Sequence, residues 1–285
     1  RRVTERLQAL APGTAKVDDM AAVHADRVSI PARAFVQVLQ QLHPSEPLVA
    51  QARALLLQWD CSMERSSAAA TIYAAARTHL YRDIVEAALE GCAHEALVSA
   101  YGTGRGAPTH AGQIYTRAVT AMACGDPTPL PLGQTWPGIV ESALQRAVTE
   151  LRDRLGNDLH TWTWDCVHVT RPRHPLSRVF ADLAALLDPP AVAAAGDGDT
   201  PQQGGYSMTE PFVVTSVSVN RYIHDPADWR RSRWIVPLGA SGHPGSRHFA
   251  DQAALWAEVQ TVPQLWDWED ITAAAETRQQ LGPKV

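Results

Sequence analysis

The residues that come nearest to a catalytic pair are Ser241 and His248, which stand in one glycine-rich segment, residues 238–249. A serine hydroxyl with a histidine base beside it can act as a nucleophile. However, Ser241 lacks the Gly-x-Ser-x-Gly spacing of a nucleophile elbow, and no Asp or Glu is obviously placed to orient His248. The sequence therefore favours a hydrogen-bonded turn after a strand, followed by a helix that Ser246 could cap.

A second group of side chains has the ligand types that zinc prefers. Its members are His160, Cys166, His168 and His174. If residues 162–170 form a strand, Cys166 and His168 share one face of it, while the other two histidines lie outside it. A lone histidine at the end of a strand is more often a buried polar group than a ligand. We therefore expect no metal and no cofactor in this chain.

Three shorter motifs fail on inspection. Residues 94–95, His-Glu, lack the second histidine of a zinc-protease helix. Residues 102–106, Gly-Thr-Gly-Arg-Gly, follow a helix rather than a strand, which argues against a dinucleotide-binding loop. Residues 197–199, Asp-Gly-Asp, resemble the start of a calcium loop, but its twelfth position is Met208 rather than Glu. We expect this last stretch to be a mobile loop.

The composition is that of a globular protein, with 285 residues of which 45% are hydrophobic. With a net charge of -5 and a pI near 6.1, the chain lacks the positive electrostatic field that nucleic-acid binding requires. No apolar run reaches the roughly 18 residues of a membrane span, so no membrane insertion is expected. Because the sequence starts at Arg1 with neither an initiator Met nor a signal peptide, we interpret it as a processed or excised piece of a longer protein.

The four cysteines are spaced about thirty to forty residues apart, and no Cys-x-x-Cys pair occurs among Cys61, Cys92, Cys124 and Cys166. A zinc ribbon or a thioredoxin-like site is therefore not expected. The even number is consistent with two disulfides in an exported protein and equally with four buried thiols.

The pattern of expected helices and strands, which must position these residues, predicts an α+β fold whose first half is helical. Residues 1–125 carry a helical pattern almost throughout, with a proline-rich break at residues 43–47. From residue 67 to about residue 101, alanine fills so many inward positions that neighbouring helices should approach closely. Residues 126–131, Asp-Pro-Thr-Pro-Leu-Pro, form a stiff connector.

Residues 126–285 are predicted to be mixed helix and strand, and to form one larger domain together with residues 1–125. Thr135 should cap a helix that has Pro137 in its first turn and ends at Gly156. A long polar loop is expected at residues 194–205. Strands are expected at residues 162–170, 212–222 and 233–238, and helices at about 246–259 and 269–279.

Six short segments occur in an order that is specific, although each segment is weak alone. They are residues 59–68, 162–176, 196–200, 212–222, 228–233 and 239–249, after which come Trp256 and residues 263–266. In this order they resemble the penicillin acylase (penicillin amidase) family of N-terminal-nucleophile hydrolases. The resemblance covers nearly the whole chain and places it in the C-terminal part of the β-subunit.

The chain departs from the family pattern at several positions. Ala240 stands where Gln is usual, and Pro201 and Gln202 replace Val-Asn. Residues 215–221 lack the common Gly-Ala-Ser-Tyr-Arg. These changes indicate a divergent member, so the substrate cannot be taken over from the penicillin-cleaving enzymes.

The resemblance implies that the chain is a fragment of an αββα assembly and supports its catalytic core. Such enzymes are cut autocatalytically to expose a serine at the start of the β-subunit, whose own α-amino group acts as the base. Backbone N–H groups and an Asn side chain hold the oxyanion. That Ser, that Asn and the family's calcium carboxylates would all lie upstream of Arg1, so this chain alone would lack the nucleophile.

One family position falls on this chain, because residues 1–5 resemble the segment that carries an arginine near the active site. This position is Arg2. Its guanidinium could orient the oxyanion Asn or a substrate carboxylate. The alternative is a solvated arginine in the first turn of a helix.

The expected parent is an amidohydrolase that cleaves an N-acyl amide bond in a β-lactam side chain, an acyl-homoserine lactone or a lipopeptide. Its partners would be the remainder of the β-subunit and an α-subunit from the same precursor. By resemblance it would be periplasmic or secreted. The alternative is a non-catalytic scaffold or binding module that keeps the fold, and a Gly-Ser, Gly-Cys or Gly-Thr cleavage junction upstream of Arg1 would favour the enzyme.

Overall fold

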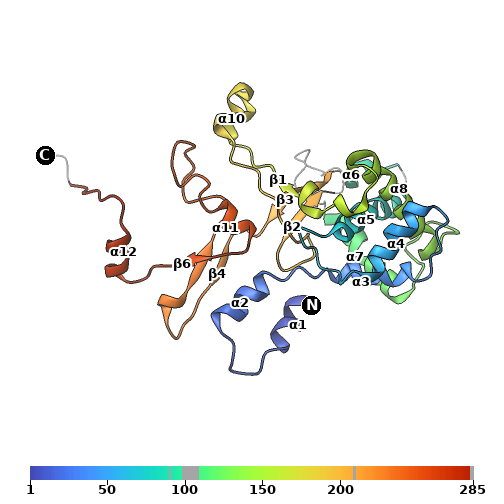
Figure 1. The fold of residues 1–285 in the computed structure, drawn as a ribbon, viewed down its shortest axis with the longest axis horizontal. Helices are drawn as coiled ribbons and strands as arrows, with labels where there is room; N and C mark the ends of the chain where they lie inside the picture. Colours follow the sequence, from blue (N-terminus) through green and yellow to red (C-terminus); the bar gives the residue numbers. More distant parts are fainter. Residues whose placement is uncertain (90, 98–108, 208–209, 283–285) are drawn as a thin grey trace.

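The computed structural model of the chain describes residues 1–89, 91–97, 109–207 and 210–282. A helical body holds the longest helices, and the strands form two small three-stranded sheets beside it (Figure 1). Helices come first along the chain and a mixture of helix and strand follows, which confirms the predicted α+β class.

Local signals account for the ends of the longer helices. Ser67 accepts a hydrogen bond from the N–H of Ala70, and Thr135 accepts one from the N–H of Gly138, as predicted for that cap. Gly156, with a φ of 92°, ends the last of them. These helices are α1 (Arg2–Gln8), α2 (Val17–His24), α3 (Ile30–Leu39), α4 (Pro47–Gln58), α5 (Ala68–Ala88), α6 (Ala93–Leu97), α7 (Thr109–Cys124) and α8 (Trp136–Leu155).

The alanine-rich stretch with helical spacing, residues 67 to about 101, is divided between two helices in the structure. Helix α5 ends at Ala88 and α6 begins at Ala93, because Gly91 adopts a φ of 83° between them. The last residues of this stretch, 98–101, and the glycine-rich residues 102–106 lie outside the described residues.

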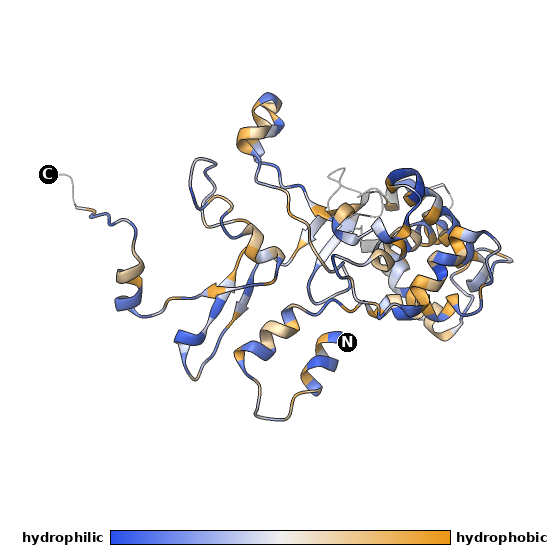
Figure 2. Ribbon diagram, in the orientation of Figure 1, coloured by the Kyte–Doolittle hydropathy of each residue, from blue (hydrophilic) through white to orange (hydrophobic). Residues whose placement is uncertain are grey.

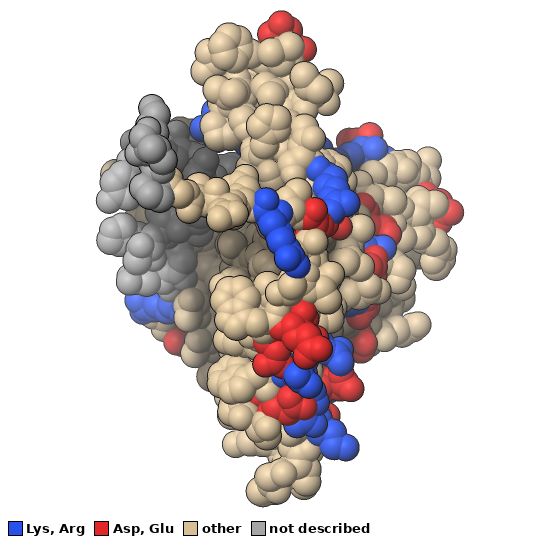
Figure 3. Space-filling view, turned by 90° about the vertical axis from the view of Figure 1, so that its left-hand side faces the viewer, with Lys and Arg blue, Asp and Glu red and all other residues tan. Residues whose placement is uncertain are grey.

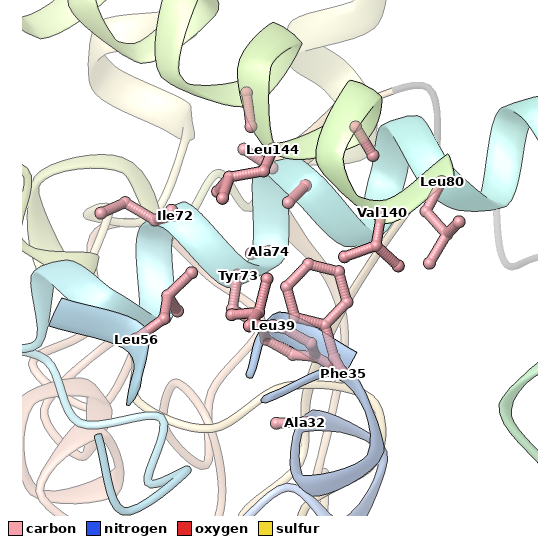
Figure 4. Packing of buried hydrophobic residues seen from close by; sticks show 14 of the residues in the cluster. Ala32, Phe35, Leu39, Leu56, Ile72, Tyr73, Ala74, Leu80, Val140 and Leu144 are labelled. Atoms are coloured by element: carbon pink, nitrogen blue, oxygen red, sulfur yellow. The ribbon is translucent and has the colours of Figure 1, made fainter. Parts of the chain in front are cut away.

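The main core forms where α5 packs against α8, with α3 and α4 beside them. Ala74 of α5 and Ala143 and Ala147 of α8 have no exposed surface, so the two helix backbones approach closely. Figure 4 shows larger side chains such as Phe35 and Leu144 filling the space around them. The apolar and polar faces of the helices in this body can be followed in Figure 2.

The same core contains Trp164 and Phe212 from the second half of the chain. Side chains from both predicted regions, 1–125 and 126–285, therefore share one hydrophobic interior. The boundary at residue 125 stays a prediction.

The first sheet has the order β1-β3-β2, and the second has the order β4-β5-β6. In the first sheet β1 pairs parallel with β3, and β2 pairs antiparallel with it. Both pairings in the second sheet are antiparallel. The strands are β1 (Val169–Thr170), β2 (Gly204–Ser207), β3 (Glu210–Val217), β4 (Arg221–Ile223), β5 (Arg233–Ile235) and β6 (Val262–Pro263).

The strand predicted at residues 162–170 is mostly wrong. A 3₁₀ turn (Leu159–Thr161) precedes this stretch, the short helix α9 (Trp164–Val167) lies within it, and only the two residues of β1 form a strand. The indole N–H groups of Trp162 and Trp164 donate to the carbonyls of Gly156 and Gly196, and both rings are fully buried. Burial of these two rings outweighed the strand preference of the tryptophans.

Predicted elements nearer the C-terminus exist but are shorter than expected. The strand predicted at residues 212–222 is interrupted after β3, where the indole of Trp256 donates to the Ser218 carbonyl. The two final helices are reduced to α11 (Ala253–Ala257) and α12 (Trp268–Ala274), and Ser246 caps neither. The other short elements are α10 (Ala184–Leu187) and the 3₁₀ turns Pro175–Arg178, Ala181–Leu183 and Trp229–Arg231.

Two further features concern the surface of the described part and the state of the cysteines. No helix of the described part is long and apolar enough to cross a membrane. On the face shown in Figure 3, acidic and basic side chains are interspersed. All four cysteines are free, with Cys61 buried and the others exposed, so neither two disulfides nor four buried thiols describes them.

Candidate functional site

Arg2 and Asp26 form the best-defined ion pair near the N-terminus. Arg2 is the first residue of α1, and Asp26 follows α2. The Nε and Nη2 atoms of Arg2 donate to the two carboxylate oxygens of Asp26 at 2.8 and 2.7 Å. Only 18% of the Arg2 side chain and 5% of the Asp26 side chain is exposed. Arg2 is therefore held in a two-point geometry, unlike a solvated arginine in a first turn.

Electrostatics reinforce this pair. Burial disfavours the charged form of Asp26, but the hydrogen bonds from Arg2 and from the Val28 N–H, together with the charges of Arg2 and Arg6, outweigh burial and lower the pKa of the carboxyl. The hydrogen bond to Asp26 also raises the pKa of Arg2. Both groups are charged over the ordinary pH range, and Arg2 keeps a fixed direction.

A second arginine links this pair to a distant loop. Arg27 donates from Nε to the side-chain oxygen of Gln202 at 2.6 Å and forms an ion pair with Glu64. The backbone N–H of Gln202 donates to the carbonyl of Asp26 at 2.9 Å. The residue that orients Arg2 is thereby fixed to residues 196–202.

Residues 196–202, which include the stretch 197–199 predicted to be mobile, instead form a tightly bonded loop. Gly196 has a φ of 79°, and a Cβ there would lie 1.8 Å from the carbonyl oxygen of Gln202. The hydroxyl of Thr200 accepts from the N–H of Asp197 at 2.8 Å and donates to the Gln202 carbonyl at 2.7 Å. The N–H of Gly196 donates to Met63. The polar residues of the loop, which suggested exposure to solvent, instead form the hydrogen bonds that hold its two ends together.

The loop places two carboxylates on one buried guanidinium. Nη1 of Arg77, on α5, lies 3.1 Å from Asp197 and 2.8 Å from Asp199. The side chains of Arg77 and Asp197 are 7% and 0% exposed. Three tyrosine rings surround the same guanidinium at 5.0 to 5.8 Å from Cζ, those of Tyr73, Tyr115 and Tyr206.

Burial raises the pKa of Asp197 to about 6, although Arg77 favours its charged form. Such a perturbed carboxyl marks a candidate functional site, but its partners here are all internal. The arrangement fixes the loop to α5 and carries no free nucleophile. Sequence reasoning missed Arg77 and Asp26; a single arginine on the apolar face of an alanine-rich helix was the available signal for Arg77.

The predicted pair of Ser241 and His248 is joined through the backbone, since the Ser241 N–H donates to the His248 carbonyl at 3.0 Å. The Ser241 hydroxyl accepts from the N–H of His243. Nδ1 of His248 lies 2.7 Å from Asp251, so a carboxylate does orient this imidazole, contrary to expectation. Its other nitrogen faces Glu276 at 3.2 Å. The structure therefore contains the hydrogen-bonded turn that the sequence favoured for this segment.

The four zinc-type side chains are not brought together. His168 is fully buried and stacks on Trp164, with ring centroids 4.1 Å apart, and burial lowers its pKa to about 3. Cys166 contacts the hydroxyl of Thr163, while His174 accepts from the N–H of Leu176. Among the described residues, no three metal-ligating side chains form a group.

The helical body, the small sheets and the interlocked loop define an α+β protein of penicillin-acylase architecture. A solved thermostable penicillin G acylase from Alcaligenes faecalis matches 100% of this chain and 52% of that chain, with a TM-score of 0.54 at 17% identity. The family model for penicillin amidase matches residues 1–273, and the chain belongs to this family.

Two curated relatives are similar over different lengths. Identity to the penicillin acylase 2 proenzyme of Pseudomonas sp. (strain SE83) is 35% over 288 residues, covering 99% of this chain and 35% of that protein. Identity to the acyl-homoserine lactone acylase QuiP of Pseudomonas aeruginosa is 26% over 148 residues, covering 48% of this chain and 18% of that protein. The chain thus spans about a third of the length of the first relative.

Proposed function

We propose that this chain is the C-terminal part of the β-subunit of an amidohydrolase of penicillin-acylase type, which hydrolyses an N-acyl amide bond. The observation that supports it most is the family match over residues 1–273. The likeness to relatives that are named penicillin acylase and acyl-homoserine lactone acylase agrees with acyl-amide chemistry.

The reaction would use an N-terminal serine that lies outside this chain and is exposed by autoproteolysis. Its hydroxyl would attack the amide carbonyl, and its α-amino group would accept the proton. The remainder of the β-subunit and an α-subunit from the same precursor would complete the site, and a calcium ion would bind in that upstream part. The processed enzyme would act in the periplasm or outside the cell.

Arg2 would be this chain's contribution to the active site. Its Nε and Nη2 are occupied by Asp26, whereas Nη1 contacts only Glu5, at 3.3 Å. A guanidinium held along one edge keeps donors on its other edge for an oxyanion-binding Asn or for a substrate carboxylate. The ion pair supports this role because it fixes the direction of those donors.

The substrate would be a small acylated amide such as an N-acyl β-lactam, an acyl-homoserine lactone or a lipopeptide. The test is to express the full-length precursor and confirm its processing by mass spectrometry. Release of chromophore is then measured from a phenylacetyl and from a long-chain acyl anilide. A variant in which the new N-terminal Ser is replaced by Ala is the control.

Hydrolysis by the processed precursor, absent in the control, is the expected result. A precursor that is processed and folded but cleaves neither amide would contradict the proposal. That outcome would favour the non-catalytic scaffold.

A further inference from the structure

Arg221, the first residue of β4, is a buried cation without an acidic partner in the described part of the chain. Its residue surface is 3% exposed. Nη1 donates to the backbone carbonyl of Trp256 at 2.6 Å, and the guanidinium carbon lies 4.7 Å from the centroid of that indole ring. Burial, with the charge of Arg27 adding to it, lowers the pKa of Arg221 to about 10. No carboxylate among the described residues offsets that effect.

The surroundings of Arg221 supply an unused polar atom and a second arginine. Helix α2 packs against β4, and the Nδ1 atom of His24, the last residue of α2, is buried without a hydrogen-bond partner. The imidazole lies near enough to Arg221 that the guanidinium, after burial, lowers the pKa of His24. Arg27 follows on the same connection. The space between α2 and β4 therefore holds the charge of Arg221 and an unpaired imidazole nitrogen, while the charge of Arg27 is balanced by its ion pair with Glu64.

A comparison within the same molecule shows what is missing at Arg221. Arg77 is buried to a similar degree, and two carboxylates lie within 3.1 Å of its Nη1. A buried guanidinium that lacks such a partner bears a desolvation cost that no ionic contact offsets. The two nitrogens of Arg221 that do not bond to Trp256 form the flat fork that binds a carboxylate at two points.

We propose that Arg221, assisted by His24, forms a binding site for a carboxylate that the described residues do not supply. The ligand chemistry is a single planar carboxylate placed against the free edge of the guanidinium. It can come from a free small carboxylate or from an acidic side chain in the remainder of the parent protein. The second source rests on the proposed function, in which the chain is part of a longer precursor.

The first experiment titrates the 285-residue chain with sodium acetate at constant ionic strength, with sodium chloride as the balancing salt. Intrinsic tryptophan fluorescence, to which Trp256 contributes, and the thermal midpoint are the two readouts. We expect saturable binding with a Kd on the order of millimolar, because acetate is a very small ligand. At tenfold excess over Kd the midpoint should rise by about 3 °C. Chloride at equal ionic strength should produce neither change.

Variants assign the response to the guanidinium. Arg221→Gln should weaken acetate binding at least about tenfold, while Arg221→Lys should retain part of it as a point charge. The matched control is Arg171→Gln, because it removes an exposed arginine. It should leave acetate binding unchanged. A wild-type chain that shows no acetate-specific response would overturn the proposal, whatever the folding of the variants. Full binding by a folded Arg221→Gln chain would overturn it as well.

The same titration of the processed precursor separates the two sources of the carboxylate. If the precursor no longer responds while the 285-residue chain does, an acidic side chain of the remainder occupies the site. If both respond, the site is open to free carboxylates. An inactive precursor that still shows either pattern would contradict the amidase function and leave the carboxylate site standing.

Discussion

Arg2 donates two hydrogen bonds, of 2.8 and 2.7 Å, to the carboxylate of Asp26, which lies 24 positions further along the chain. The carbonyl of Asp26 in turn accepts from Gln202, so the pair is fixed to the loop of residues 196–202. This relationship converts a flexible side chain at the start of a short helix into a directed group. It also identifies Asp26 as the residue on which the orientation of Arg2 depends.

Under the proposed function, replacing Asp26 should reduce catalysis in the processed precursor. In Asp26→Asn one oxygen that accepts from Arg2 becomes an NH₂ group, which cannot accept. We expect kcat/KM to fall about 10- to 100-fold, as for other residues that orient an active-site group. Arg1→Gln is the matched control, because Arg1 is exposed and pairs only with Glu5.

A double-mutant cycle separates positioning from stability. Since Arg2→Lys also removes the two-point contact, its effect on kcat/KM should be non-additive with that of Asp26→Asn. If Asp26→Asn lowers the thermal midpoint but leaves kcat/KM within about twofold of wild type, Asp26 has a structural role only.

The closure of the same loop can be tested at its first glycine. In Gly196→Ala the new Cβ would lie 1.8 Å from the Gln202 carbonyl oxygen at a φ of 79°, so the backbone must move. We expect the free energy of unfolding to fall by about 2–4 kcal/mol. In Gly198→Ala the nearest atom is 3.8 Å from the added Cβ, so the cost should stay below about 1 kcal/mol. Equal urea-denaturation midpoints for the two variants would show that the loop is loose.

Much of the helical half could be predicted because its signals are local. Thr135 and Gly156 mark the two ends of α8 in the sequence and in the structure. The strand expected at residues 162–170 failed, because Trp162 and Trp164 bond to the carbonyls of Gly156 and Gly196. The hydrogen bond from Trp164 to Gly196 joins residues 32 positions apart, and no pattern of neighbouring residues predicts it.

The candidate site was predicted only in part for the same reason. The resemblance pointed to Arg2, but its partner Asp26 is visible only after α1 and α2 have packed. Residues 197–199 were predicted to be mobile because their carboxylates look solvated in the sequence. Their partner Arg77 is 120 positions away from Asp197, and burial of that pair decides the structure of the loop.

The close approach of α5 and α8 predicts that alanine there cannot be enlarged. Ala143 has no exposed surface and lies in the core that the two helices share. Ala143→Leu should lower the free energy of unfolding by about 1–3 kcal/mol, because added methylenes must push the helices apart. Ala87→Leu, on the exposed face of α5, should change it by no more than about 0.5 kcal/mol. Chemical denaturation of both variants measures the contrast, which a loosely packed core would abolish.

Asp197 should give the chain a pH dependence of unusual sign. Burial raises the pKa of Asp197 to about 6 from its ordinary value of 3.8, so between these values the folded chain binds more protons than the unfolded chain. The contribution of Asp197 to stability is therefore fully present below about pH 4 and is lost as the pH rises through about 6. A shift of this size corresponds to roughly 3 kcal/mol.

Asp197→Asn removes the titrating group, so the difference in unfolding free energy between wild type and variant should change between pH 4 and pH 6.5 and then level off. Asp153→Asn is the control, because the Asp153 side chain is 66% exposed. Its pH profile should run parallel to that of wild type. If the difference between wild type and Asp197→Asn is constant over this range, Arg77 keeps Asp197 charged throughout. The pair would then be an ordinary buried ion pair, whose stability is lost only at strongly acidic pH.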